Sequence, residues 1–454
     1  MKRKNIKTYT RAETVAKTIF ASKLCGHRSI NEMIGINSHK NTNLKMIYKK
    51  NEYIPSTHGL RDAIIDTDYK QIEDINKSII LKAKENKIFR KNTIDGLCVS
   101  AWDGVESVET RKNISGLPER EYEELGEVRK YVKYLCGMQI GPMLNVMIAA
   151  KQLQEVEKIK TKTGNERAKT IGETTAFKEQ WNEMERLIGK VIDVHVFDAL
   201  YLTEPIITLI NKENKYFVIR MKDETRELYK DAKGLFDSRE ADYKYELVEI
   251  IITKNTKYTK KAKKKNTTKT KTKIEKRKIT DKKLGEKKLI STKEQTKKNS
   301  IVITTINERV VARKEVWSDE FDYTRYNGKV RVVRSKEEIY RSGKISKQEL
   351  YVASNMLEHD VETILKIMHY RWNIENNGFR TLKQRYNFEH IFIGELNAIN
   401  YMVQMIFMAF NLLELYMKVR LSKKVNMTWN IITRIFENSF HSDKNIFILF
   451  NDSS

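Results

Sequence analysis

One stretch of this sequence restricts the chain to a single class of fold. Residues 191–197 form an apolar, β-branched run that is typical of a buried β-strand. Asp198 follows at once, and Thr203-Glu204-Pro205 then carries the polar cap and early proline that begin a helix. A strand that leads into a helix is the building unit of α/β folds, which present functional groups at the carboxyl ends of their strands. Asp198 is therefore a candidate catalytic residue.

A second aspartate follows a similar pattern nearer the N-terminus. Residues 97–102 alternate in polarity and lead to Asp103-Gly104, so we expect a strand that ends at Asp103. Taken by itself, an isolated Asp-Gly pair is more typical of a simple turn. Further strands are expected at residues 216–222, 247–252, 301–306, 330–335 and 350–355. With helical segments among these strands, the sequence predicts an α/β fold.

The third acidic candidate, Glu375, lies in an amphipathic helical pattern with a basic and aromatic setting. Arg371 precedes it by four residues, so both lie on one helical face, and Lys383 lies two turns beyond. A surface ion pair is enough to explain the spacing of Arg371 and Glu375. The alternative is that Glu375 joins Asp103 and Asp198 in a set of metal-binding carboxylates.

Such a carboxylate set has a clear chemical use. Hydrolysis of a phosphodiester needs an activated water and a stabilised leaving oxygen, and two Mg²⁺ ions held by shared carboxylates supply both. Hard oxygen ligands select Mg²⁺ or Mn²⁺. The three cysteines, Cys25, Cys98 and Cys136, are widely spaced and form no zinc pattern, which favours a reducing compartment.

The charge of the chain points to a polyanionic partner. It has 86 Lys and Arg against 60 Asp and Glu, a net charge of +26, which most often indicates nucleic acid. Part of this surplus fits the Lys-, Asn- and Ile-rich composition of an AT-rich coding genome. No run of 18 apolar residues and no apolar leader is present, so we expect a soluble intracellular protein.

Residues 254–298 are a low-complexity segment with 20 Lys and Arg against 4 Asp and Glu. Such a composition cannot bury a core, and we expect the segment to be mobile on its own. It could serve as a phosphate-binding arm that adds affinity without sequence specificity. A tolerated expansion of a surface loop explains it equally well.

Three local motifs resemble the DDE transposases of bacterial insertion sequences. Residues 370–383 resemble the family's Arg-Trp-x-Ile-Glu-Asn-x-Gly-Phe block around the catalytic glutamate. Residues 196–201 resemble the strand with the second aspartate, and residues 102–106 resemble the strand end with the first. The resemblance implies a ribonuclease-H-like core, with a mixed sheet flanked by helices, an N-terminal helical module and an inserted β-rich region.

The resemblance also implies a reaction and the residues that perform it. Asp103, Asp198 and Glu375 would hold Mg²⁺, with Mn²⁺ as a substitute. Tyr370, Arg371 and Lys383 would contact DNA near the cleaved phosphate. The family's better-known signature has its tyrosine further ahead of the arginine and its lysine one residue closer to the glutamate, and this chain departs from it at both places.

The implied function is that of a transposase. The enzyme would bind the terminal inverted repeats of double-stranded DNA, cleave there and transfer the 3′-hydroxyl ends to target DNA. A homodimer is expected, since two ends must be brought together, acting on the nucleoid in the bacterial cytoplasm. Two alternatives stay open: a metal-dependent nuclease of the same fold without strand transfer, and a non-catalytic DNA-binding protein derived from a transposase.

The expected domain organisation follows the same order. Residues 1–92 form an N-terminal helical module, for which DNA binding and simple packing are both open. Residues 93–222 form the first part of the catalytic core, and residues 223–355 form the inserted β-rich region. Residues 356–454 carry the glutamate helix and the C-terminal helices that complete the core.

Overall fold

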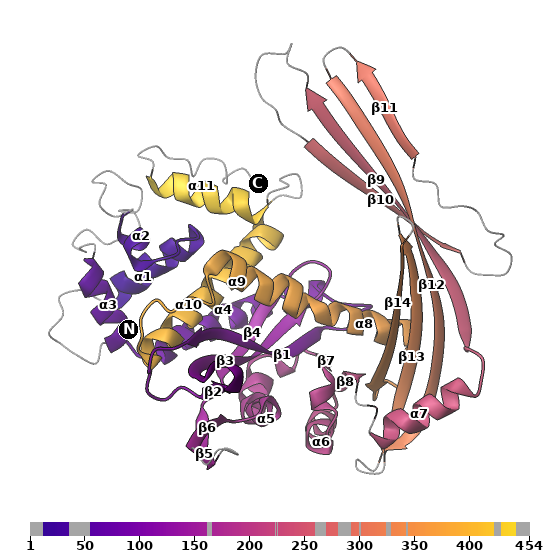
Figure 1. Cartoon of the computed structure of the whole chain (residues 1–454), viewed down its shortest axis with the longest axis horizontal. Helices are drawn as coiled ribbons and strands as arrows, with labels where there is room; N and C mark the ends of the chain where they lie inside the picture. The colour runs from indigo at the N-terminus through magenta and orange to yellow at the C-terminus, as the bar shows by residue number, and fades with distance from the viewer. Residues whose placement is uncertain are drawn as a thin grey trace. The chain divides into compact units, whose positions relative to one another are not determined.

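The computed structural model divides the chain into two compact units, formed by residues 1–217 with 366–454 and by residues 218–365. The residues described are 12–35, 55–160, 166–222, 224, 226–258, 269–279, 292–298, 301–323, 328–341, 344–421 and 428–441. Both units contain paired strands, as Figure 1 shows. The acidic candidates all belong to the first unit.

The sheet of the first unit is centred on strand β1 (Val99–Thr110). On one side β1 pairs in parallel with β7 (Val194–Phe197), and on the other it pairs antiparallel with β3 (Glu127–Ile140). Strands β2 (Glu119–Tyr122) and β4 (Val146–Gln152) both pair with β3. Strands β5 (Glu155–Lys160) and β6 (Glu166–Thr170) form a separate hairpin. The sheet is therefore mixed, because it combines parallel and antiparallel pairs.

Strand β1 continues well beyond Asp103, contrary to our expectation that it ends there. The antiparallel ladder with β3 runs through Asp103, which lies opposite Cys136, and on to Thr110. The pairing with β7, in contrast, has its last residues at Ala101 and Val196. Because β3 supplies partners for the backbone of β1, the Asp-Gly pair does not turn the chain.

Helices cover the sheet of this unit. Those with bounds in the first half of the chain are α1 (Ala12–Leu24), α2 (Ile30–Gly35), α3 (Thr57–Asp66), α4 (Lys70–Glu85), α5 (Glu173–Met184) and α6 (Glu204–Lys212). Later in the chain come α9 (Arg380–Tyr386), α10 (Leu396–Leu415) and α11 (Trp429–His441). Ser56 caps α3 by accepting the N–H of Gly59 at 3.2 Å.

Helix α10 forms the centre of the helical part of the unit. In Figure 1 it lies beside α1, α3 and α4, with which it shares contacts. The common core is apolar and fully covered, and its members include Val15, Ile19, Leu60, Ile64, Ile72, Tyr401, Met402 and Met405. Each large side chain buried in such a core stabilises the fold by roughly 1.5–3 kcal/mol. Residues 396–420 are long and apolar enough to cross a membrane, but 83% of the most apolar window is buried inside the protein, so no span is indicated.

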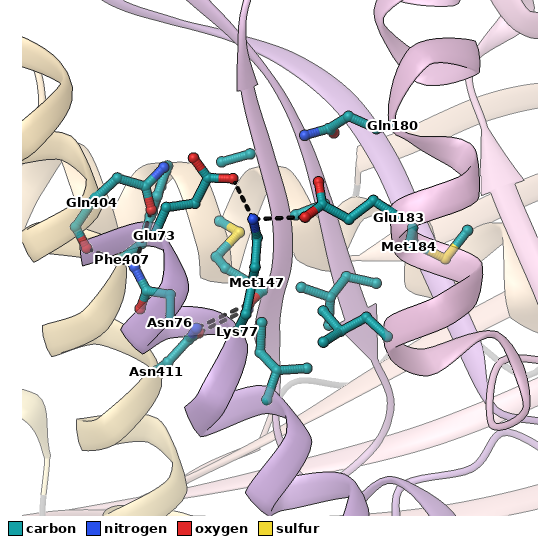
Figure 2. Close-up of a pocket in the computed structure, with 15 residues that line it drawn as sticks. Glu73, Asn76, Lys77, Met147, Gln180, Glu183, Met184, Gln404, Phe407 and Asn411 are labelled. Carbon is teal, nitrogen blue, oxygen red and sulfur yellow. Dashed lines mark hydrogen bonds and ion pairs between the residues drawn. The ribbon is translucent and has the colours of Figure 1, made fainter. Parts of the chain in front are cut away.

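Helix α4 is also joined to α5 by a lysine, as Figure 2 shows. Lys77 lies between Glu73, 2.9 Å away on α4, and Glu183, 2.6 Å away on α5. The amide of Asn76 donates to the side chain of Gln404 on α10 at 3.0 Å. These side chains line a cavity of about 50 Å³. Helix α4 thus contacts both α5 and α10 through these side chains.

The second unit is a curved antiparallel sheet with helix α7 (Glu227–Asp237) and the first residues of helix α8 (Val361–Asn373). Its order is β10-β9-β12-β13-β14-β8, and β11 also pairs with β12. The bounds are β8 (Tyr216–Met221), β9 (Tyr243–Tyr258), β10 (Lys269–Ile279), β11 (Thr292–Lys298), β12 (Ile301–Tyr323), β13 (Gly328–Arg341) and β14 (Lys344–Ser354). Within this unit Arg334 lies over the ring of Trp317, with 4.7 Å from the guanidinium carbon to the ring centroid.

Part of the Lys-rich segment 254–298 is regular structure, which the composition did not predict. Strand β10 pairs along β9, and β11 pairs along β12. Backbone ladders of this kind need no apolar side chains to form their hydrogen bonds. Residues 259–268 and 280–291 of the segment lie outside the described residues. The prediction of an α/β fold with a mixed sheet flanked by helices is confirmed.

Candidate active site

Asp103 and Asp198 lie level with each other on neighbouring strands. In the parallel pairing of β1 with β7, Ala101 lies opposite Val196. Two residues further along each strand come Asp103 and Asp198, and residues an even number apart point to the same face. Asp198 is still extended, and its carboxylate accepts the N–H of Leu200 at 3.1 Å. The register therefore places both aspartates at one end of this strand pair.

Glu375 reaches Asp103 through a shared arginine. Helix α8 (Val361–Asn373) carries Arg371, and Glu375 follows in a π-helical turn, Ile374–Phe379. The guanidinium of Arg371 lies 3.2 Å from Asp103 Oδ2 and 2.7 Å from Glu375 Oε1. Arg371 is 3% exposed, Asp103 22% and Glu375 46%. The pair of Arg371 and Glu375 is thus more than the surface ion pair that its spacing alone suggests.

The surroundings of Asp103 disfavour the ionised form of its carboxyl group. Burial raises the pKa of Asp103 to about 6, the Arg371 guanidinium opposes this shift, and the negative charges of Glu375 and Glu173 add to it. Several carboxylates thus converge on one partly buried place with one arginine between two of them. Such an arrangement favours the binding of a further cation.

Glu173, in the first turn of α5, is a member of this site that sequence analysis missed. Its carboxylate lies 2.8 Å from Lys133 Nζ and accepts the hydroxyl of Tyr201 at 3.2 Å. It also fills the space beside Gly104, where a Cβ would lie 2.3 Å from Glu173 Oε1. An acidic residue in the first turn of a helix is common because it interacts with the helix dipole. No local signal therefore distinguished Glu173 from other glutamates.

The donor set fits a divalent cation, although the carboxylates are not gathered as metal ligands. Within the part of the chain that the structure describes, no three His, Cys, Asp or Glu side chains form a group that could hold a metal ion. Arg371 accounts for this, because its guanidinium lies between Asp103 and Glu375. The available ligands are carboxylate oxygens, which suit Mg²⁺ and Mn²⁺.

Lys383 lies on α9, just after the π-helical turn. A π turn closes its hydrogen bonds over five residues where an α turn uses four, so it takes up one extra residue. Glu375 and Lys383 are eight positions apart, and a π turn lies between them. The helix therefore advances by about two turns from one residue to the other. Lys383 Nζ lies 2.6 Å from Glu389 in this structure.

Tyr370 lines a separate polar groove in the first unit. The groove has a volume of about 560 Å³ and lies beside residues on both sides of Glu375. Its lining includes Asn373, Asn377, Arg380, Gln384 and Lys418. Amide, guanidinium and aromatic side chains are the groups that proteins use to contact bases and phosphates.

Comparison with known families finds one matching family model. The family described as transposase DDE domain matches residues 159–412, more than half of the 454 residues. The chain belongs to the transposase DDE domain family. No curated protein sequence matches it.

The family match assigns the mixed α/β core to a known fold. The core is ribonuclease-H-like, as the sequence resemblance implied. Asp198 and Glu375 lie inside the matched residues, and Asp103 lies ahead of them. DDE transposases act on DNA and generally use divalent metal ions, typically Mg²⁺.

Proposed function

We propose that this transposase binds the ends of an insertion sequence, cleaves the DNA there and joins the freed 3′-hydroxyl ends to target DNA. The observation that carries the proposal is the convergence of acidic side chains around Arg371. Asp103 and Glu375 both contact its guanidinium, and the strand register brings Asp198 level with Asp103. A protein that only binds DNA has no use for this set, because carboxylates repel phosphate.

The three carboxylates are the proposed metal ligands. When bound, two Mg²⁺ or Mn²⁺ ions would activate the attacking hydroxyl or water and stabilise the leaving oxygen. Asp103 and Asp198 would approach the ions from adjacent strands, and Glu375 from the helix. Strands β1 and β7 provide a rigid support for the two aspartates, since their backbones are hydrogen-bonded along the pairing.

Arg371, Tyr370 and Lys383 are the proposed DNA contacts. The Nε–H of Arg371 is buried and has no hydrogen-bond partner within the described residues, so a phosphate oxygen could accept it. Tyr370 lies in the groove lined by Arg380 and Lys418, where a DNA strand would meet both charge and amide groups. Lys383 would exchange its ion pair with Glu389 for a phosphate.

The proposal extends to the setting of the reaction. Two element ends must be joined in one event, so we propose that the enzyme works as a homodimer on DNA. We also propose that it acts in the cytoplasm, on nucleoid DNA. We propose that residues 1–92 form a DNA-binding module. Residues 223–355 would form an insertion into the catalytic core.

The test uses DNA that carries the inverted repeats flanking the gene, with Mg²⁺ present. Wild-type protein should cut at the repeat ends and produce strands joined to a second DNA. Asp198→Asn and Glu375→Gln should each lower cleavage by at least about a thousandfold, while mobility shifts show unchanged DNA binding.

Asp193→Asn is the matched control for Asp198→Asn, because Asp193 lies at the opposite end of β7 and accepts the N–H of Cys98 at 2.8 Å. We expect Asp193→Asn to retain cleavage. Cleavage without joined products would favour the nuclease alternative. Normal cleavage by both active-site variants would contradict the assignment of the carboxylates.

A further inference from the structure

We propose that Glu173 is a positioning residue that fixes the chain segment of Asp103 to the chain segment of Asp198. The inference rests on the proposed function, since it gives Glu173 the task of setting the geometry of two proposed metal ligands. Neither the sequence motifs nor the family match assigns a role to this glutamate. Three contacts, to Gly104, Tyr201 and Lys133, carry the argument.

The first contact is with Gly104, the residue after Asp103. A Cβ built on Gly104 would lie 2.3 Å from Oε1 and 2.5 Å from Cδ of Glu173. A side chain at this position would push the Glu173 carboxylate away, because real Cβ atoms do not approach other atoms so closely. The absence of a side chain at Gly104 therefore lets the Glu173 carboxylate pack against the backbone that carries Asp103.

The second contact is with Tyr201, three residues after Asp198. The hydroxyl of Tyr201 donates to Glu173 Oε2 at 3.2 Å, and Tyr201 is fully buried. Tyr201 ends the short 3₁₀ turn (Ala199–Tyr201) that Asp198 begins as its N-cap. A turn held at its last residue also restrains its first, so the hydrogen bond to Glu173 limits the movement of Asp198.

The third contact balances the charge of Glu173. Lys133, on β3, places its Nζ 2.8 Å from Glu173 Oε1, and the glutamate side chain is 13% exposed. Charged groups at this depth persist when they are paired. One carboxylate thus connects β1, β3, the turn after β7 and the start of α5.

An ordinary helix-terminus role would not require these contacts. Glu204 holds the equivalent first-turn position on α6, and it is exposed. A glutamate that only interacts with the helix dipole works in that exposed position. The burial of Glu173 against Gly104 and Tyr201 indicates a positional task in addition.

The experiment is a double-mutant cycle read through metal affinity. Mn²⁺ binding is measured by titration calorimetry for wild type, Gly104→Ala, Glu173→Ala and the double variant. Each single variant should bind Mn²⁺ about tenfold more weakly, because each removes the glutamate from its place. The double variant should bind no more weakly than either single variant, since the new Cβ then meets empty space.

Two milder variants distinguish a local effect on Mn²⁺ binding from a general loss of structure. Tyr201→Phe keeps the buried ring and should still weaken Mn²⁺ binding severalfold, with an unchanged melting temperature. Glu204→Gln is the matched control and should bind Mn²⁺ as wild type does. Fully additive losses of Mn²⁺ affinity in the cycle would overturn the inference about Glu173. Wild-type affinity in both Tyr201→Phe and Glu173→Ala would do the same. Either result would leave the proposed function standing. Wild-type protein that neither binds Mn²⁺ nor cleaves DNA would overturn the proposed function together with it.

Discussion

Arg371 holds together two carboxylates that would otherwise repel each other. Its guanidinium contacts both Asp103 and Glu375 and is almost completely buried. Opposite charges at such distances interact strongly where water is excluded. A divalent ion would neutralise the same two carboxylates, so we expect metal binding to loosen their contacts with Arg371.

A buried glutamate elsewhere in the unit gives a prediction about pH. Burial raises the pKa of Glu414 to about 7, while Lys418 and the N–H of Asn145 oppose the shift. Folded protein therefore holds this proton more tightly than the unfolded chain does. The free energy of unfolding should fall as pH rises from about 4.5 to about 7.

Glu414→Gln should remove this fall in the free energy of unfolding, because the glutamine side chain does not ionise. At pH 8 the variant should be more stable than wild type by roughly 3 kcal/mol, since each unit of pKa shift corresponds to about 1.4 kcal/mol. Urea unfolding at pH 5 and pH 8 measures the effect, with the exposed Glu395→Gln as control. Equal stability of Glu414→Gln and wild type at pH 8 would contradict the prediction.

The residues of the site differ in how far the sequence could reveal them. Asp198 and Glu375 lie in local patterns, a strand before a helix and a helical face, that a short window of sequence contains. Glu173 depends on a meeting of α5 with β1 and the turn after β7, which no local window contains. Its one trace in the sequence is Gly104, whose missing side chain makes room for the carboxylate.

A π-helical turn lies where the spacing of this chain differs from the better-known signature. Sequence comparison placed Lys383 one residue further from Glu375 than in the better-known signature. The turn Ile374–Phe379 takes up that residue. It also lies close to the sheet, since a Cβ on Gly378 would lie 3.0 Å from Met138 Sδ. Sequence analysis could count the extra residue, but it could not predict the π turn, because such a turn has no distinctive composition.

Deletion of one residue tests this explanation. Without Asn377, which is exposed, the turn can become α-helical while Glu375 and Lys383 keep their faces. We expect a folded, active protein that loses less than about 2 kcal/mol of stability. Deletion of the exposed Lys366 from the regular helix α8 is the control, and it should cost at least about 3 kcal/mol because it rotates the buried side chains that precede the π turn. Equal damage from both deletions, measured by thermal unfolding and cleavage, would refute the explanation.

Strand β1 shows the opposite case, in which a local signal was misleading. Asp103-Gly104 has the composition of a turn, yet the strand continues because β3 pairs with it on both sides of that position. Tertiary pairing overrides the local preference here. The correction leaves Asp103 beside the end of the pairing with β7, where Asp198 follows.

At the scale of the whole molecule, positive charge is unevenly distributed along the sequence. The Lys-rich segment 254–298 carries a net +16, from 20 basic and 4 acidic residues, of the total +26. Its composition predicted neither β10 nor β11, because their pairing depends on backbone hydrogen bonds with β9 and β12. The family match gives the segment no separate role.

Five lysines at positions 260, 261, 263, 264 and 265 test whether the segment binds DNA. If all five contact phosphates, changing them to glutamine should reduce the slope of log affinity against log salt by about 4 to 5. Fluorescence anisotropy between 50 and 300 mM salt, as a rough working range, measures the slope. Changing the same five to arginine keeps the charge and should keep the slope. An unchanged slope in the glutamine variant would mean that these five lysines do not contact DNA.

The shared metal site is tested most directly by titration calorimetry. The experiment measures Mn²⁺ binding to wild type and to Asp103→Asn, Asp198→Asn and Glu375→Gln. All three carboxylates are proposed to surround the same ions. We therefore expect wild type to bind Mn²⁺ and each substitution to weaken the affinity by at least about tenfold, or about 1.4 kcal/mol, without loss of the folded state. Wild-type affinity in all three variants would contradict a shared metal site.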